Sequence, residues 1–233
     1  MSRYVPLSPL QYFAPREDYT GAFGWICGYS ADAAFLNAAV ERFTCQTEAQ
    51  RAYMGKVALV ALMDRGQPQV QAHEAPAVLH VPLRDGSRFA LLHAKVALLG
   101  YRHEQMSHRW CLRLLVCTGN WTRETVERSL DAMWAVEICS EDLTSRDKEK
   151  VQIRADVAAA WDFFQWLLPS FDLNALTSTP DSLTALALRQ FNEWAQAVVA
   201  PRKKPRFFDS RYQSLLRQLP ELVRRHASDS DRN

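Results

Sequence analysis

The first 140 residues contain a succession of apolar runs, and these runs constrain the fold more than any other feature of the sequence. They cover residues 22–28, 56–63, 77–83, 89–101, 110–118 and 132–138. Each run has about the length of a β-strand, and turn-forming residues such as Asp64-Arg65-Gly66 follow some of them. Runs that are apolar throughout are typical of strands in a sheet covered on both faces. We therefore predict an α/β fold with a mixed, largely buried β-sheet that is flanked by helices.

Other segments of the chain show helical spacing. Residues 31–43 carry apolar side chains at positions 35, 36, 39, 40 and 43, and amphipathic patterns follow at 157–171 and 182–199. Asp85-Gly86 predicts a tight, hairpin-like turn between the third and fourth apolar runs. Thr122 is a candidate N-cap with Thr125 in the first turn of its helix. Residues 206–219 are expected to begin as a strand and continue as a helix. The predicted organisation is an α/β unit over residues 1–150 and a mainly helical extension over residues 151–233.

The net charge and the cysteines limit which partners and which cellular compartment are expected for this chain. The formal net charge is +2, so any contact with nucleic acid must rest on a local patch, of which residues 201–206 (PRKKPR) are the clearest. This segment is either a solvated linker or a phosphate contact. The five cysteines form no CxxC motif and no zinc-like cluster, and Cys27, Cys111, Cys117 and Cys139 lie in apolar runs. We expect these four to be buried thiols, which fits a reducing cytoplasm.

A membrane partner is not expected from the sequence. The N-terminus has no hydrophobic signal core, and no apolar run reaches the length of about 18 residues that a membrane span needs.

His93 and Lys95 are the polar interruptions of the apolar run 89–101. Residues two apart in a strand point to the same face, so the imidazole and the ammonium are expected side by side. A single histidine in an apolar strand is more often a satisfied core residue. A lysine beside it is costly to bury without an anion, however, and phosphate is an obvious anion.

Two later polar residues are candidates for the same site. The strand 110–118 leads into Thr118-Gly119-Asn120, where the glycine permits a tight turn and the Asn120 amide offers donors to a phosphate oxygen. Asp131 opens the next strand and would reach the same edge of the sheet if the strands are neighbours. A carboxylate bonded to one imidazole nitrogen would leave the other nitrogen free to attack. Taken singly, Asn120 and Asp131 are more often a turn former and a helix cap.

These motifs, in this order, resemble the phospholipase D superfamily and look closest to its tyrosyl-DNA phosphodiesterase branch. That branch has a His-x-Lys strand, then a strand ending in Thr-(Ser/Ala)-Asn, then a Gln or Glu three residues before a Trp. His93 and Lys95 match the first element, Thr118-Gly119-Asn120 matches the second, and Asp131 stands three residues before Trp134. The wider superfamily has an Asp five residues after the Lys; this chain has a glycine there, and the branch also lacks the Asp. The resemblance follows the element order over residues 20–200 and is sharp over 89–137.

The resemblance implies a phospholipase D-like half-domain over residues 1–150 and a phosphodiesterase or nuclease for nucleic-acid phosphodiesters, with DNA ahead of RNA and DNA 3′-end processing as one activity. One histidine attacks phosphorus, and a second protonates the leaving oxygen and then activates water. Two lysines and two asparagines hold the phosphoryl oxygens, so no metal or other cofactor is expected. His93, Lys95, Asn120 and Asp131 are thus the expected catalytic residues, and Thr118, Gly119 and Trp121 the expected substrate contacts.

The mechanism needs the His-x-Lys motif twice, and this chain has it once. The other histidines, at positions 73, 80, 103, 108 and 226, have no lysine two residues later. The second motif would come from a second copy in a homodimer, from another subunit or from a longer chain. Residues 162–199 followed by 206–210 resemble the lead-in to a second half. A phospholipid phosphodiesterase and a non-catalytic binding half remain as alternatives, and the absence of an amphipathic anchor in the predicted elements disfavours phospholipid.

Overall fold

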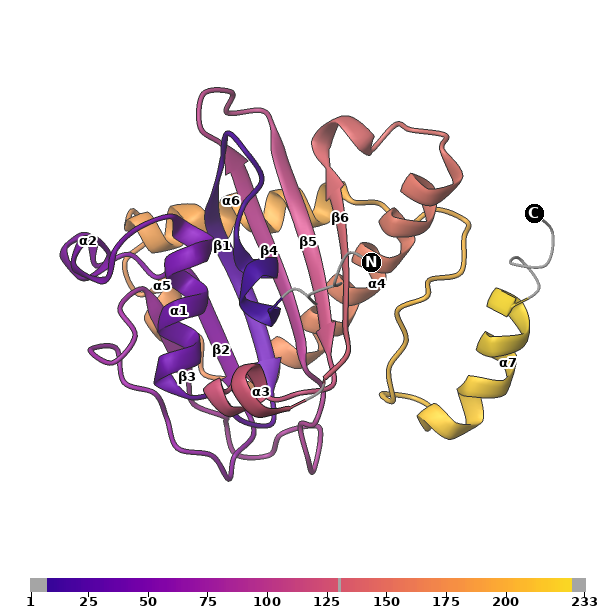
Figure 1. Ribbon diagram of the computed structural model, residues 1–233, viewed down its shortest axis with the longest axis horizontal. Helices are drawn as coiled ribbons and strands as arrows, with labels where there is room; N and C mark the ends of the chain where they lie inside the picture. The colour runs from indigo at the N-terminus through magenta and orange to yellow at the C-terminus, as the bar shows by residue number, and fades with distance from the viewer. Residues whose placement is uncertain (1–7, 130, 228–233) are drawn as a thin grey trace, which may run out of the picture.

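The fold is a six-stranded mixed β-sheet with helices on both faces, as the computed structural model of residues 8–129 and 131–227 shows (Figure 1). The strand order is β3-β2-β1-β4-β5-β6. The pairs β1–β2 and β2–β3 are parallel, whereas the pairs β1–β4, β4–β5 and β5–β6 are antiparallel. The predicted α/β class with a mixed, covered sheet is therefore confirmed.

Each predicted apolar run overlaps one strand of the sheet. The strands are β1 (Tyr19–Gly28), β2 (Leu59–Met63), β3 (Val78–Val81), β4 (Val96–His103), β5 (Trp110–Cys117) and β6 (Met133–Cys139).

The fourth strand is shorter than predicted, and this matters for the site. The prediction started it at residue 89, but β4 begins at Val96, which pairs with Cys27 near the end of β1. Beyond that point the backbone leaves the sheet, and the N–H of Leu92 donates to Oδ2 of Asp64 at 2.7 Å. The predicted hairpin at Asp85-Gly86 is also wrong, because β2 and β1 lie between β3 and β4. The turn itself is present, with φ of 76° at Gly86.

Helices from both ends of the chain cover the sheet. On one face, α1 (Ala33–Thr44) and the 3₁₀ helix η1 (Pro9–Phe13) contribute to one hydrophobic core. On the other, α4 (Lys148–Leu167) and α6 (Leu183–Ala197) contribute to a second core (Figure 1). The helices predicted in the C-terminal extension therefore pack directly on the strands. Four short elements connect these parts: α2 (Glu48–Met54), η2 (Ser140–Asp142), η3 (Leu168–Ser170) and α5 (Asn174–Thr177).

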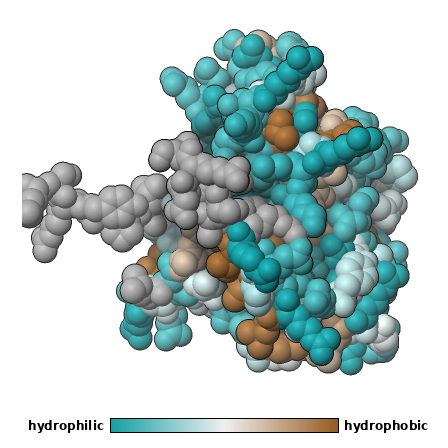
Figure 2. Space-filling view, turned by 90° about the vertical axis from the view of Figure 1, so that its right-hand side faces the viewer, coloured by the Kyte–Doolittle hydropathy of each residue, from teal (hydrophilic) through white to brown (hydrophobic). Residues whose placement is uncertain are grey.

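The last helix, α7 (Leu215–Ala227), does not pack on the sheet. It lies at the edge of the molecule nearest to α4 and β6 (Figure 1). The strand expected at its start does not form, because the backbone N–H groups of Arg206 and Phe207 donate to Asp156 of α4. Several aliphatic side chains of α7 are exposed: Leu215, Leu216, Leu219 and Val223. In Figure 2 hydrophobic residues gather among hydrophilic ones on this side of the molecule. The expectation of no amphipathic anchor did not take this exposed stripe of α7 into account.

The expectation that Cys111 and Cys139 are buried thiols is also corrected, because the two form a disulfide. The antiparallel register of β5 and β6 places them directly opposite each other. Cys27 and Cys117 are buried free thiols as predicted, and Cys45 is exposed. Within the described residues we find no helix with the length and apolar character that crossing a membrane requires.

Candidate active site

His93 and Lys95 contact each other in the extended segment that leads into β4. The Nζ atom of Lys95 lies 3.0 Å from Nδ1 and 3.1 Å from Nε2 of His93, and it donates to the carbonyl oxygen of His93 at 3.1 Å. His93 is exposed, whereas Lys95 is only 6% exposed. The two side chains are thus adjacent as predicted, although no strand pairing holds them.

The Lys95 ammonium is buried without a paired carboxylate. Burial lowers the pKa of Lys95, and the nearby Cys117 and Asp131 oppose this shift. No Asp or Glu among the described residues lies within ion-pair distance of it. A buried cation in this state is stabilised by an anion that binds beside it.

The loop after β5 is tied to the same segment. The backbone N–H of Cys117 donates to the carbonyl oxygen of Lys95 at 2.9 Å, and Thr118-Gly119-Asn120 follows directly. A Cβ atom at Gly119 would lie 2.3 Å from Cγ2 of Thr125 and 2.6 Å from Cγ of Asp131, so only glycine fits there. Thr125 belongs to α3 (Arg123–Arg128), whose N-cap is Thr122, as predicted.

Asn120 keeps an unused hydrogen-bonding atom in this loop. Its Oδ1 atom is buried and has no hydrogen-bond partner among the described residues. An amide oxygen accepts hydrogen bonds, so this atom would not bind a phosphate oxygen, and Asn120 is not among the residues that line the cavity beside Lys95.

Asp131 holds the loop and does not contact His93. Oγ1 of Thr118 donates to Oδ1 of Asp131 at 2.7 Å and accepts from the N–H of Ala132 at 3.0 Å. The ring nitrogens of His93 are bonded to Lys95 and, within the described chain, to no carboxylate. The tautomer-fixing contact expected of Asp131 is therefore not formed, and Asp131 instead affects Lys95 through its charge.

Trp121 lies in the core and not at the site. It is 1% exposed, its Nε1 donates to the carbonyl oxygen of Cys27 at 2.8 Å, and its ring packs against Phe13 and Phe35. This corrects the expectation that Trp121 contacts a substrate. The apolar environment of the β1–α1 side, which only the folded arrangement reveals, explains the difference.

A cavity of about 740 Å³ lies beside His93 and Lys95, with Cys117 also on its wall. Its wall also includes residues that the sequence did not predict for the site, Arg88, Trp166, Phe208 and Arg211, as well as Arg206 of the predicted basic segment. The helical spacing of α4 gives a signal for Trp166, but residues 206–211 have no periodic pattern that would place them here. The predicted basic segment 201–206 is partly neutralised, because Lys204 pairs with Glu221 and Arg206 with Asp156.

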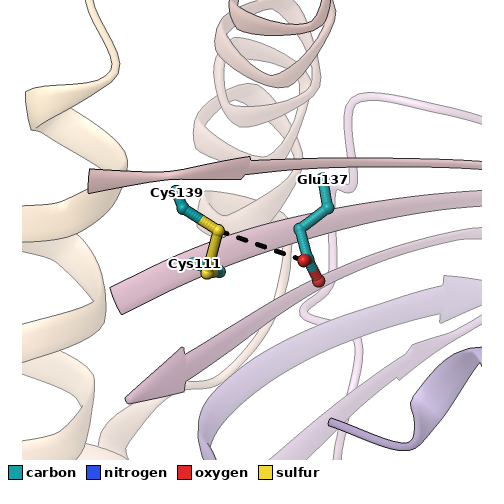
Figure 3. A group of neighbouring side chains, drawn as sticks. All are labelled: Cys111, Glu137 and Cys139. Atoms are coloured by element: carbon teal, nitrogen blue, oxygen red, sulfur yellow. Dashed lines mark hydrogen bonds between the residues drawn. A yellow bond between two sulfur atoms is a disulfide. The ribbon is translucent and has the colours of Figure 1, made fainter. Parts of the chain in front are cut away.

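The described residues contain one group with metal-ligand chemistry, Cys111, Glu137 and Cys139 (Figure 3). It does not fit a metal, because the two sulfur atoms are bonded to each other. Arg113 pairs with Glu137 at 2.6 Å, and Nη1 of Arg16 lies 3.2 Å from Sγ of Cys139. Guanidinium groups in these positions oppose a cation, so this cluster is a cross-strand brace of the sheet.

No protein-family model, curated protein or solved structure matches the chain.

Proposed function

We propose that this protein is a phosphodiesterase of the phospholipase D type that acts on nucleic-acid phosphodiesters, DNA ahead of RNA, through a phosphohistidine on His93. The observation that carries the proposal is the Lys95 ammonium, which is buried, contacts the His93 ring and has no paired carboxylate among the residues that the structure describes. A phosphodiester supplies the missing negative charge and presents phosphorus to the adjacent imidazole. The cavity beside the pair supports a ligand site in the same place.

The proposed reaction has two displacements. A ring nitrogen of His93 forms a bond to phosphorus while the bond to the leaving oxygen breaks, and that oxygen takes a proton from a second acid. Water then attacks the phosphohistidine, gives its proton to the same group and releases His93. Lys95 holds a phosphoryl oxygen and stabilises its charge. Asn120 is proposed to hold a phosphoryl oxygen beside Lys95. Asp131 is proposed to position the loop that contains Thr118.

The second acid has to come from outside the single His-x-Lys motif of this chain. We propose that a second copy, or a subunit that carries another such motif, completes the site. The exposed aliphatic side chains of α7 support such a partner, because Leu215 of this helix also lines the cavity. Sedimentation of the protein alone measures self-association. If the protein is a monomer at all concentrations, a second copy is excluded and the subunit with another motif remains as the source of the second acid.

The test is cleavage of single-stranded oligonucleotides that carry a 3′ adduct, assayed in EDTA. His93→Ala should lower the rate about a hundredfold or more, which is the usual contribution of such a group. His73→Ala is the matched control, because His73 is exposed and lies outside the cavity. Equal rates for wild type and His93→Ala would reject the proposal.

Phospholipid hydrolysis is the second candidate, and α7 favours it. A helix with an exposed aliphatic stripe and arginines such as Arg217 and Arg224 resembles helices that rest on membrane surfaces. Release of head groups from liposomes by wild type, but not by His93→Ala, would establish this substrate class instead of nucleic acid. A non-catalytic binding half is the third alternative, and it predicts no turnover in either assay until a motif-bearing subunit is added.

We also propose a cytoplasmic location. The free thiols of Cys27, Cys45 and Cys117 support it, whereas the Cys111–Cys139 disulfide counts against it. Thiol counting on protein taken rapidly from cells decides between the two.

A further inference from the structure

The cavity beside Lys95 has an aromatic wall as well as cationic groups. Trp134 of β6, Trp166 of α4 and Phe208 line it together with His93 and Lys95. Trp134 and Trp166 are half-buried and Phe208 is 37% exposed, so part of each ring remains open to a ligand. A cavity that combines an anion site with exposed aromatic faces suits a ligand that has both a phosphate and a planar ring.

The side of the cavity formed by residues 206–211 is held by two arginines. Nε of Arg206 donates to Oδ2 of Asp156 at 2.9 Å, and Nη2 of Arg211 donates to Oδ2 of Asp162 at 2.8 Å. The Arg206 guanidinium also lies 5.5 Å from the ring centroid of Trp134. Both positive charges are therefore neutralised by α4, and these arginines build the wall and are not available as anion ligands.

Among the described residues, two lining cations have no carboxylate partner, Arg88 and Lys95. Arg88 is exposed, and within the described residues it makes no hydrogen bond or ion pair. Both lie on the segment that enters β4, seven residues apart in the sequence. The cavity thus has one free cation buried beside His93 and a second one that is open to solvent.

We propose that this cavity binds one nucleoside of a single strand, with its two flanking phosphates on Lys95 and Arg88 and its base on the aromatic wall. The proposal rests on the proposed function for the position of the reacting phosphate, and it assigns Arg88 and Phe208 as substrate-binding residues. The cavity volume of about 740 Å³ accommodates a nucleotide. Sequence preference is expected to be weak, since every base has a face that can stack.

The experiment measures binding of thymidine 3′,5′-bisphosphate by tryptophan fluorescence, with ribose 5-phosphate and inorganic phosphate as comparison ligands. The bisphosphate should bind about a hundredfold more tightly than ribose 5-phosphate, with about tenfold from the second phosphate and about tenfold from the base. Arg88→Gln should weaken the bisphosphate about tenfold and leave inorganic phosphate unchanged. Phe208→Ala should weaken the bisphosphate about tenfold and leave ribose 5-phosphate unchanged. Arg42→Gln is the control, because Arg42 is an exposed arginine on α1, outside the cavity.

Equal affinities for the bisphosphate and ribose 5-phosphate would overturn the proposal, and so would unchanged binding in Arg88→Gln. Arg88 is exposed, so its substitution leaves the core intact and the thermal melt should match wild type. Repeating the titration in His93→Ala separates this inference from the proposed function. Binding that persists in His93→Ala while cleavage is also unaffected rejects the catalytic role and retains the nucleoside site.

Discussion

Replacing Gly119 with alanine tests how tightly the candidate loop is built. The added methyl group would lie 2.3 Å from Cγ2 of Thr125 and 2.6 Å from Oδ2 of Asp131, well inside van der Waals contact. Neither contact can relax freely, because Thr125 is buried and Asp131 is bonded to Thr118. Overpacking of this kind costs about 1–3 kcal/mol. In a chain of this size that corresponds to a fall in Tm of roughly 2–12 °C.

Urea unfolding followed by tryptophan fluorescence measures this loss. Gly66→Ala is the matched control, since its nearest neighbour would be Oδ1 of Asp64 at 3.9 Å, and it should change stability little. Adding Thr125→Ser to Gly119→Ala removes one of the two clashes and should recover part of the loss. If Gly119→Ala were as stable as wild type, the close packing of Asp131 over this loop would be refuted.

Four further predictions concern charge and covalent structure. Burial lowers the pKa of Lys56 to about 8, so the free energy of unfolding should rise with pH between about 8 and the ordinary lysine pKa. In urea titrations the free energy of unfolding of Lys56→Met should exceed that of wild type by about 1–2 kcal/mol at pH 7 and by less at pH 10. A constant difference would contradict the burial of the ammonium. Asp156→Asn leaves Arg206 without its buried partner and should cost about 3 kcal/mol, with faster proteolysis of residues 201–211; unchanged proteolysis would show that the ion pair does not hold the segment. The unreduced, denatured protein should titrate three thiols and the reduced protein five, whereas five in both would exclude the disulfide. Binding of a phosphorothioate dinucleotide should weaken as pH rises through a value below the ordinary lysine pKa, and this transition should be absent in Lys95→Gln; persistence of the transition would assign it to another group.

The strands and the main helices could be predicted because their signals are local. Apolar runs and helical spacing depend on neighbouring residues, and the N-cap at Thr122 depends on a side chain three positions from its partner. The start of β4 could not be predicted in this way. It depends on where β1 ends and on the Asp64 carboxylate that takes the Leu92 N–H.

The site was predictable only in part, for the same reason. His93 and Lys95 are close in sequence, and their contact could be anticipated. The disulfide depends on the register of β5 and β6, and the burial of Trp121 depends on the packing of α1 against the sheet. The side of the cavity formed by residues 206–211 lies more than a hundred positions after Lys95 and is held by ion pairs that no periodic pattern reveals.

The most direct test of the central claim is to look for the covalent intermediate. The protein is mixed with an oligonucleotide whose transferred phosphate is radiolabelled, quenched within seconds in alkali and digested for mass spectrometry. The account predicts an acid-labile, alkali-stable phosphate on His93, which disappears in His93→Ala and remains in His73→Ala. Label on another residue, or turnover by His93→Ala at the wild-type rate, would contradict it.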